Sequence, residues 1–376
     1  MSDVLILGGG AIGLSLAYDL ARRGRTVRVL ERAADVGQES SWAGAGILPA
    51  AVVHPNDPPL LQLGGHSAKL HVEWAARLLH ETGIDNGYRR CGSLNLADDA
   101  ATEASLAEEV DHWQEQGTTC RALDAAAGAD VEPALAEAFR SGRFRAAYHV
   151  PDEAQLRNPR HVRALTAACV KLGVEIITDT NVESFVVRGD ELVEVRTSRG
   201  GYSAKQYALC TGAWTGDLAK QLNLDLRVKP IRGQIVLLRT PAPVIRGVVM
   251  LGRHYFVPRD DGRVLVGSTE EDVGFDKSNT DEAVARLKRF AFEIAPALRS
   301  AEVERTWAGL RPHSADDLPY LGRVPALQNT YVAAGHYRWG LTLSTATAVA
   351  MTQLMHGETP LVDLTEFRVN RTTVVR

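Results

Sequence analysis

Residues 8–13 (GGGAIG) constrain the fold of this chain more than any other stretch. They follow a continuous apolar segment at residues 3–7 and precede a helical run that ends at Gly24. A second apolar segment closes at Glu31. Strand, glycine turn, helix and strand in this order form the βαβ unit that binds dinucleotides, with the helix N-terminus facing the pyrophosphate. The sequence therefore predicts a Rossmann-like domain at the start of the chain.

Each residue of this pattern has a physical role in such a unit. Gly8 makes the tight turn, Gly10 lets the backbone approach a pyrophosphate, and Gly13 lets helix and strand pack closely. Glu31 follows at the distance of about 20 residues that suits a ribose-binding carboxylate. A glycine turn without a nucleotide would not need that acid. At this point NAD and FAD both fit the pattern.

The segment at residues 39–50 (ESSWAGAGILPA) favours FAD over NAD. It is rich in small residues and shows neither strand nor helix periodicity, so it can lie flat along an extended cofactor. Ser40 and Ser41 would supply hydrogen-bond donors there. A nicotinamide dehydrogenase more often continues with another helix and strand.

The later segments predict a second domain inserted into the first. A strand near residues 205–211 returns to the first sheet, whereas residues 231–240 and a hairpin turning at 260–262 suggest antiparallel strands. The expected fold is α/β (α+β overall), a Rossmann-like FAD-binding domain with an inserted antiparallel-sheet substrate domain. The FAD-binding domain would comprise residues 1–85, 145–225 and 305–376, and the substrate domain 86–144 and 226–304. A closing helix is expected from near Gly340, and an acidic helix with a solvated face at 98–117.

Composition excludes several other classes of protein. The chain has 376 residues, a net charge of −4 and no basic stripe, which argues against a nucleic-acid partner. We found no apolar run long enough to cross a membrane and no cleavage site, so a cytoplasmic protein is expected. Four scattered cysteines indicate reduced thiols, and His66 and His71 lack the spacing of metal ligands. An assembly of identical copies is compatible with the sequence.

Six ordered segments carry a family resemblance: GGGAIG, SSWAGAGIL, KPIRGQIV, HYFVPRDDGRVLVGST, WAGLRPHSADDLPYLG and GHYRWGL. With them the chain resembles the flavin-dependent D-amino acid oxidase family, and most closely the glycine oxidases of thiamine biosynthesis. The resemblance implies a flavoprotein oxidoreductase that oxidises glycine or another small amino acid or amine. The imine would hydrolyse to an oxo acid and ammonia, and O2 would become hydrogen peroxide.

Two alternatives stay open beside this activity. One is a dehydrogenase of the same fold acting on D-amino acids or secondary amines and passing electrons to a quinone. The other is a flavin-binding accessory protein of tRNA modification. Related sarcosine oxidases attach flavin to a cysteine, but no cysteine follows Cys210 here, so the resemblance implies non-covalent FAD.

The resemblance also implies a set of cofactor-binding residues. The expected contacts to the ribose, phosphates and adenine, and along the rest of the cofactor, are Gly8, Gly10, Ala11, Ile12, Gly13, Glu31, Arg32, Ser40, Ser41, Ala45, Gly46, Ile47, Val182 and Gly212. Those bordering the isoalloxazine are His336, Tyr337, Arg338, Trp339, Gly340, Leu341 and Thr342.

Three residues are implied in catalysis and substrate binding. Arg311 in GLRP would pair with the substrate carboxylate, and Tyr255 would assist it. Alternation along its strand lets either Tyr255 or Phe256 face the pocket, but not both. Arg338 could meet the negative charge of reduced flavin, grip the substrate, cap the strand end or pair with a local acid. Glu270 also lies where it could approach the pocket.

Overall fold

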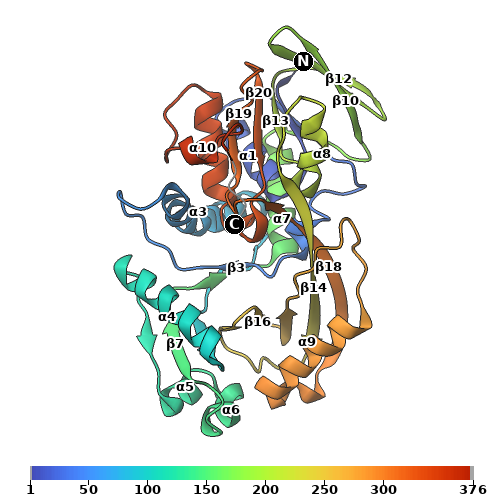
Figure 1. Ribbon diagram of the computed structural model, residues 1–376. Helices are drawn as coiled ribbons and strands as arrows, with labels where there is room; N and C mark the ends of the chain where they lie inside the picture. Colours follow the sequence, from blue (N-terminus) through green and yellow to red (C-terminus); the bar gives the residue numbers. More distant parts are fainter. Residues whose placement is uncertain (1, 373–376) are drawn as a thin grey trace.

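Two large β-sheets organise the computed structural model, which describes residues 2–372 (Figure 1). The first sheet is six-stranded, with the order β19-β20-β13-β1-β2-β9. Its neighbouring strands run parallel, except β19 against β20. The strands are β1 (Ser2–Leu7), β2 (Val27–Leu30), β9 (Glu175–Ile177), β13 (Ala204–Leu209), β19 (Tyr320–Arg323) and β20 (Thr330–Ala334).

Both faces of this sheet are covered, which explains why β1 reads as a continuous apolar run. Val4 and Ile6 face four helices, α1 (Ala11–Arg22), α3 (Pro59–Thr82), α7 (Asn158–Lys171) and α10 (Ser344–Met355). Leu5 and Leu7 face the other layer. That layer consists of α8 (Thr215–Lys220) and the three-stranded sheet of β10 (Val182–Arg188), β11 (Glu191–Thr197) and β12 (Gly200–Tyr202).

The second sheet has eight strands in the order β18-β14-β17-β16-β15-β5-β7-β6. One face packs on α9 (Asp281–Ile294) and on the segment containing α5 (Ala125–Val131) and α6 (Ala136–Arg140). The strands are β5 (Ser93–Ala97), β6 (Arg121–Ala122), β7 (Ala146–Val150), β14 (Val228–Arg239), β15 (Val248–Leu251), β16 (His254–Pro258), β17 (Arg263–Gly267) and β18 (Glu302–Ser314). The predicted hairpin at 260–262 joins β16 to β17.

The sheet departs from the purely antiparallel expectation at one pair, because β5 and β15 run parallel. These strands come from separate stretches of the chain, so no tight turn forces them to be antiparallel.

The positions of β7 and β18 in the eight-stranded sheet bear on the expected domain boundaries. Residues 146–150 and 305–314 pair in the eight-stranded sheet, although the expected boundaries put them in the FAD-binding domain. The boundaries themselves stay a prediction.

Shorter elements connect the two sheets. A small sheet joins β3 (Ile47–Leu48), β4 (Arg89–Arg90) and β8 (Ala154–Gln155), and α2 (Ser40–Ala43) precedes it. The expected acidic helix is α4 (Ala100–Glu115), which begins with a capping box between Asp99 and Thr102. The helix expected from Gly340 begins at Ser344, because a 3-10 turn at Tyr337–Trp339 comes first. Within the described residues, no helix is long and apolar enough to span a membrane.

Candidate active site

A cavity of about 840 Å³ lies between the two sheets. At one end it is lined by Leu7 and Leu30, where β1 and β2 reach their carboxyl ends. That is where open α/β sheets bind ligands. At the other end it is lined by Asn95 and Tyr255 of the eight-stranded sheet. The cavity therefore extends from a dinucleotide-type site to the eight-stranded sheet.

The N-terminus of α1 opens into the first end of this cavity. Among the described residues, Gly10 precedes α1 without a side-chain cap, and Ala11 N–H donates to Ser41 Oγ at 2.8 Å. A Cβ at Gly13 would overlap the carbonyl of Gly8, so only glycine allows this close approach. Free N–H groups and the positive end of the helix dipole suit the pyrophosphate of a dinucleotide.

Glu31 lies beside that helix terminus and is held by two backbone donors. Its Oε2 accepts from Gly9 N–H and its Oε1 from Ala33 N–H, both at 2.9 Å. Each carboxylate oxygen keeps a further lone pair that a ribose hydroxyl could use. Arg32 stacks 3.4 Å from the ring centroid of Trp214 and pairs with Glu39 at 2.8 Å.

The segment after β2 is more regular than expected. The prediction of no helix or strand at 39–50 is wrong for α2 and β3. Ser40 Oγ donates to the Leu310 carbonyl, and Asn158 Nδ2 donates to the Ser41 carbonyl at 2.8 Å. These side-chain bonds hold the short helix α2, which periodicity in the sequence could not reveal.

Hydrogen bonds hold the backbone at two more of the residues expected to bind the cofactor, Ala45 and Gly46. Leu156 N–H donates to the Gly46 carbonyl at 2.8 Å, and Arg259 donates to the Ala45 carbonyl at 2.8 Å. Arg259 is buried, and this burial lowers the pKa of its guanidinium to about 9. No local pattern predicts this role, because Arg259 stands directly before the hairpin turn at 260–262. Ala45, Gly46, Ile47, Val182 and Gly212 all line the cavity.

The segment at residues 336–342 lines the cavity as a unit, and His71 holds it from behind. His71 Nε2 donates to the carbonyls of Leu341 and Thr342 at 3.1 and 3.0 Å. Burial lowers the pKa of His71 to about 4 and that of His336 to about 3, so both rings are neutral at pH 7. Sequence reasoning excluded His71 as a metal ligand but gave no hint of this structural role.

Arg311 is placed by β18 at the second end of the cavity. Its guanidinium donates to Ser268 Oγ at 2.8 Å and to the Thr269 carbonyl at 3.2 Å. The side chain crosses Gly233, where a Cβ would overlap the guanidinium. Removal from water lowers the pKa of Arg311 from its ordinary value, against the influence of Tyr255. Arginine starts high enough to keep its charge at pH 7.

Tyr255 lies at the same end of the cavity, and its side chain points to the opposite face of β16 from that of Phe256, as expected for a strand. Tyr255 lines the cavity, whereas Phe256 is fully buried in the core against α9. Burial raises the pKa of the Tyr255 phenol above its ordinary value, although the charge of Arg311 opposes the shift. Tyr255 is therefore a hydrogen-bond donor across the usual pH range.

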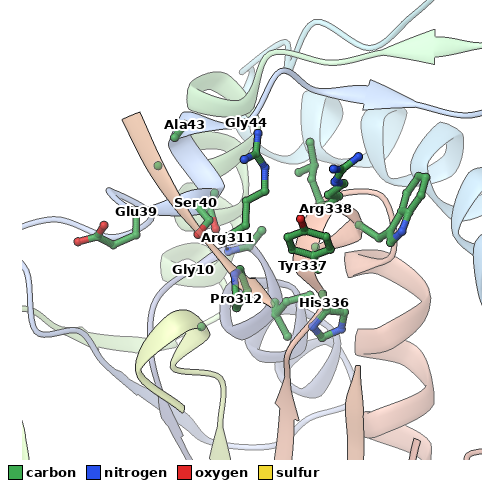
Figure 2. Close-up of a pocket in the computed structure, with 18 of the residues that line it drawn as sticks. Gly10, Glu39, Ser40, Ala43, Gly44, Arg311, Pro312, His336, Tyr337 and Arg338 are labelled. Carbon is green, nitrogen blue, oxygen red and sulfur yellow. Dashed lines mark hydrogen bonds between the residues drawn. The ribbon is translucent and has the colours of Figure 1, made fainter. Parts of the chain in front are cut away.

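The 337–339 turn faces Arg311 from the six-stranded sheet (Figure 2). Arg338 pairs with Glu270, which also accepts from the Tyr337 hydroxyl. Of the four roles open for Arg338, the structure shows the pairing with a local acid. Trp339 keeps 43% of its surface exposed at the mouth.

Four polar or aromatic residues that the sequence did not predict also line the cavity: Glu109, His112, Trp113 and Glu153. Three of them belong to α4, the helix expected to present only a solvated face. Glu153 is buried, and burial raises its pKa to about 7, with a further contribution from the charge of Glu109. Because the acidic composition of α4 predicts a solvent-facing helix, the sequence does not indicate its contact with the cavity.

This fold and cavity define a flavin-type dinucleotide oxidoreductase. Residues 3–354 match the model of the DAO family, FAD dependent oxidoreductase, and the chain belongs to that family. FAD is accordingly its cofactor, and the glycine-rich turn, the open α1 terminus and Glu31 fit that group.

Named relatives cover almost the whole chain. It is 35% identical to a glycine oxidase of Pseudomonas putida over 96% of each sequence. The crystal structure of glycine oxidase from Geobacillus kaustophilus superposes with a TM-score of 0.93, at 30% identity and 99% coverage of both chains. The iminodiacetate oxidase of Chelativorans sp. BNC1 superposes with a TM-score of 0.86, at 27% identity over 97% of this chain and 98% of that one.

Proposed function

We propose that this chain oxidises glycine or another small amino acid or amine to its imine. Hydrolysis of the imine would release an oxo acid and ammonia. The observation that carries the proposal is the charged guanidinium of Arg311 at the second end of the cavity, beside Tyr255, where its hydrogen bonds go to the neutral Ser268 hydroxyl and Thr269 carbonyl. A cation in that position is suited to receive a carboxylate.

The protein's task in such a reaction is to bind and orient the substrate. A planar guanidinium grips a carboxylate with two parallel hydrogen bonds, which fixes the α-carbon better than a lysine would. The Tyr255 hydroxyl can donate a further hydrogen bond to the same group. Bound FAD, held non-covalently, would accept hydride from the α-carbon and return the electrons to O2 as hydrogen peroxide.

No side-chain base is needed for this chemistry, because the α-hydrogen leaves with its electron pair. The substrate amine must instead be neutral, so that its lone pair can form the imine. The residues of the 336–342 segment line the cavity and would border the reacting face. A role in thiamine thiazole synthesis concerns the use of the imine, and it rests on the family resemblance.

Anaerobic mixing tests the proposal directly. The flavoprotein is mixed with glycine, sarcosine, D-alanine and methylamine, and the flavin absorbance is followed. The amino acids should bleach the flavin, and methylamine should do so far more slowly because it lacks the carboxylate. Absence of bleaching with every compound would refute amine oxidation. Oxygen consumption compared with reduction of a quinone-like dye then separates an oxidase from a dehydrogenase.

A further inference from the structure

Glu270 stands at the substrate end of the cavity and draws three side chains together. It follows the end of β17 and accepts from Arg338, from the Tyr337 hydroxyl and, at 3.1 Å, from Arg253. Glu270, Arg253, Arg338 and Arg311 all line the same cavity. The acid therefore joins the turn that borders the flavin site to the wall that carries the substrate arginine.

The charges of this cluster are unequally available to a ligand. Arg311 donates to a hydroxyl and a carbonyl, so these two contacts leave its charge uncompensated. Arg338 is neutralised by Glu270, whose side chain is only 25% exposed. The side chain of Arg253 is 76% exposed, so water and salt screen its charge. Among the arginines that line the described part of the cavity, Arg311 is thus the buried one without a hydrogen-bonded acid, although the charge of Glu270 also acts on it.

We propose that Glu270 is a specificity-determining residue that restricts the cavity to substrates with a single carboxylate. This inference rests on the proposed function, because it takes Arg311 as the anchor of that carboxylate. A second carboxylate on the amine or α-carbon must either face Glu270 or displace it from Arg338. Both outcomes cost binding energy, so the selectivity comes from an unfavourable contact with the wrong substrate.

Replacement of the acid by an amide should release Arg338 to bind a second carboxylate. Glu270→Gln keeps an acceptor for Tyr337 and removes the charge that holds Arg338. The pair is partly exposed, with 44% of the Arg338 side chain accessible, so the effect is moderate. We expect a change in selectivity of about tenfold, which is modest for a charge contact at a rim.

The experiment compares two secondary amines that differ in one group. Sarcosine carries a methyl group on its nitrogen, and iminodiacetate carries a second carboxymethyl group there. The quantity measured is the ratio of kcat/KM for iminodiacetate to that for sarcosine, using the flavin-loaded enzyme. Wild type should favour sarcosine, and Glu270→Gln should raise the ratio about tenfold at low salt and less at high salt.

Two further variants locate the effect. Asp272→Asn removes one negative charge two residues along the chain, from an exposed pair with Lys229 at 2.6 Å, and should leave the ratio unchanged. Arg338→Gln added to Glu270→Gln should abolish the gain, because Arg338 is the group that binds the second carboxylate. A gain that persists in this double variant would overturn the assignment.

The remaining outcomes are also decisive. A wild type that already prefers iminodiacetate overturns the inference, as does an unchanged ratio in Glu270→Gln. An equal loss of kcat/KM on both substrates would show that Glu270 only ties down the 337–339 turn. If wild type oxidises neither sarcosine nor glycine, the proposed function itself fails, which is a different result from an unchanged ratio.

Discussion

Replacing Arg311 by alanine should remove most of the binding energy of the substrate carboxylate. The substitution leaves that carboxylate, Ser268 Oγ and the Thr269 carbonyl without their charged donor. Loss of one partner from a buried charge pair costs about 2–5 kcal/mol. That corresponds to a fall in kcat/KM of roughly 30-fold to several thousand-fold. Arg311→Lys should recover only part of the loss, because an ammonium cannot form the two parallel bonds.

Steady-state oxygen uptake with glycine, together with the flavin absorbance spectrum, measures this effect. KM should rise strongly while the protein stays folded and yellow. Arg305→Ala is the matched control, because Arg305 lies on the same strand with its side chain exposed against Trp42. Near-wild-type kinetics of a yellow Arg311→Ala protein would refute the carboxylate anchor. Loss of flavin or of folded protein would instead assign Arg311 a structural role.

Further predictions concern the cofactor and the response to pH. Acid precipitation should leave yellow FAD in the supernatant, and flavin retained in the pellet would contradict non-covalent binding. Glu31→Gln puts an amide N–H against a backbone N–H of Gly9 or Ala33, so FAD affinity measured by fluorescence titration should fall by roughly 5- to 150-fold. kcat/KM should rise with pH across roughly pH 6–10, because the neutral amine reacts; a flat profile would count against hydride transfer from that form. Folding raises the pKa of Glu153 from 4.5 to about 7. Below pH 4.5 this carboxyl is neutral in both the folded and the unfolded chain, so it does not change the free energy of unfolding. As pH rises from 4.5 through 7 the carboxyl ionises more easily in the unfolded chain than in its buried site, and the fold is destabilised. Glu153→Gln should therefore be more stable than wild type by about 3 kcal/mol at pH 8 and by little at pH 4; equal differences in urea unfolding would contradict the shift.

The parts of the fold that the sequence predicted well are those governed by local periodicity. The unit from β1 to β2, the strand β20 and the hairpin of β16 and β17 each depend on alternation, on apolar runs or on turn residues close in sequence. The parallel pairing of β5 with β15 could not be read in this way. It joins stretches more than a hundred residues apart, and its direction is set by packing.

The candidate site follows the same division. Glycine spacing and the position of Glu31 come from one short motif, so their positions beside the cavity could be anticipated. His71, Arg259 and the face of α4 are brought to the cavity by tertiary packing, and their neighbours in sequence give no signal. The role of Gly233 could be predicted only in part. A glycine inside a strand suggests close approach of another group, but not that the group is an arginine side chain.

The hydrogen bonds between α2 and β18 couple the two sides of the cavity mechanically. Ser40 donates to the Leu310 carbonyl next to Arg311, and Trp307 Nε1 donates to the Ala43 carbonyl at 3.0 Å. The segment expected to lie along the cofactor and the strand that carries Arg311, the proposed substrate anchor, therefore brace one another. A substitution that breaks either hydrogen bond should therefore disturb the cofactor side of the cavity and the Arg311 side together.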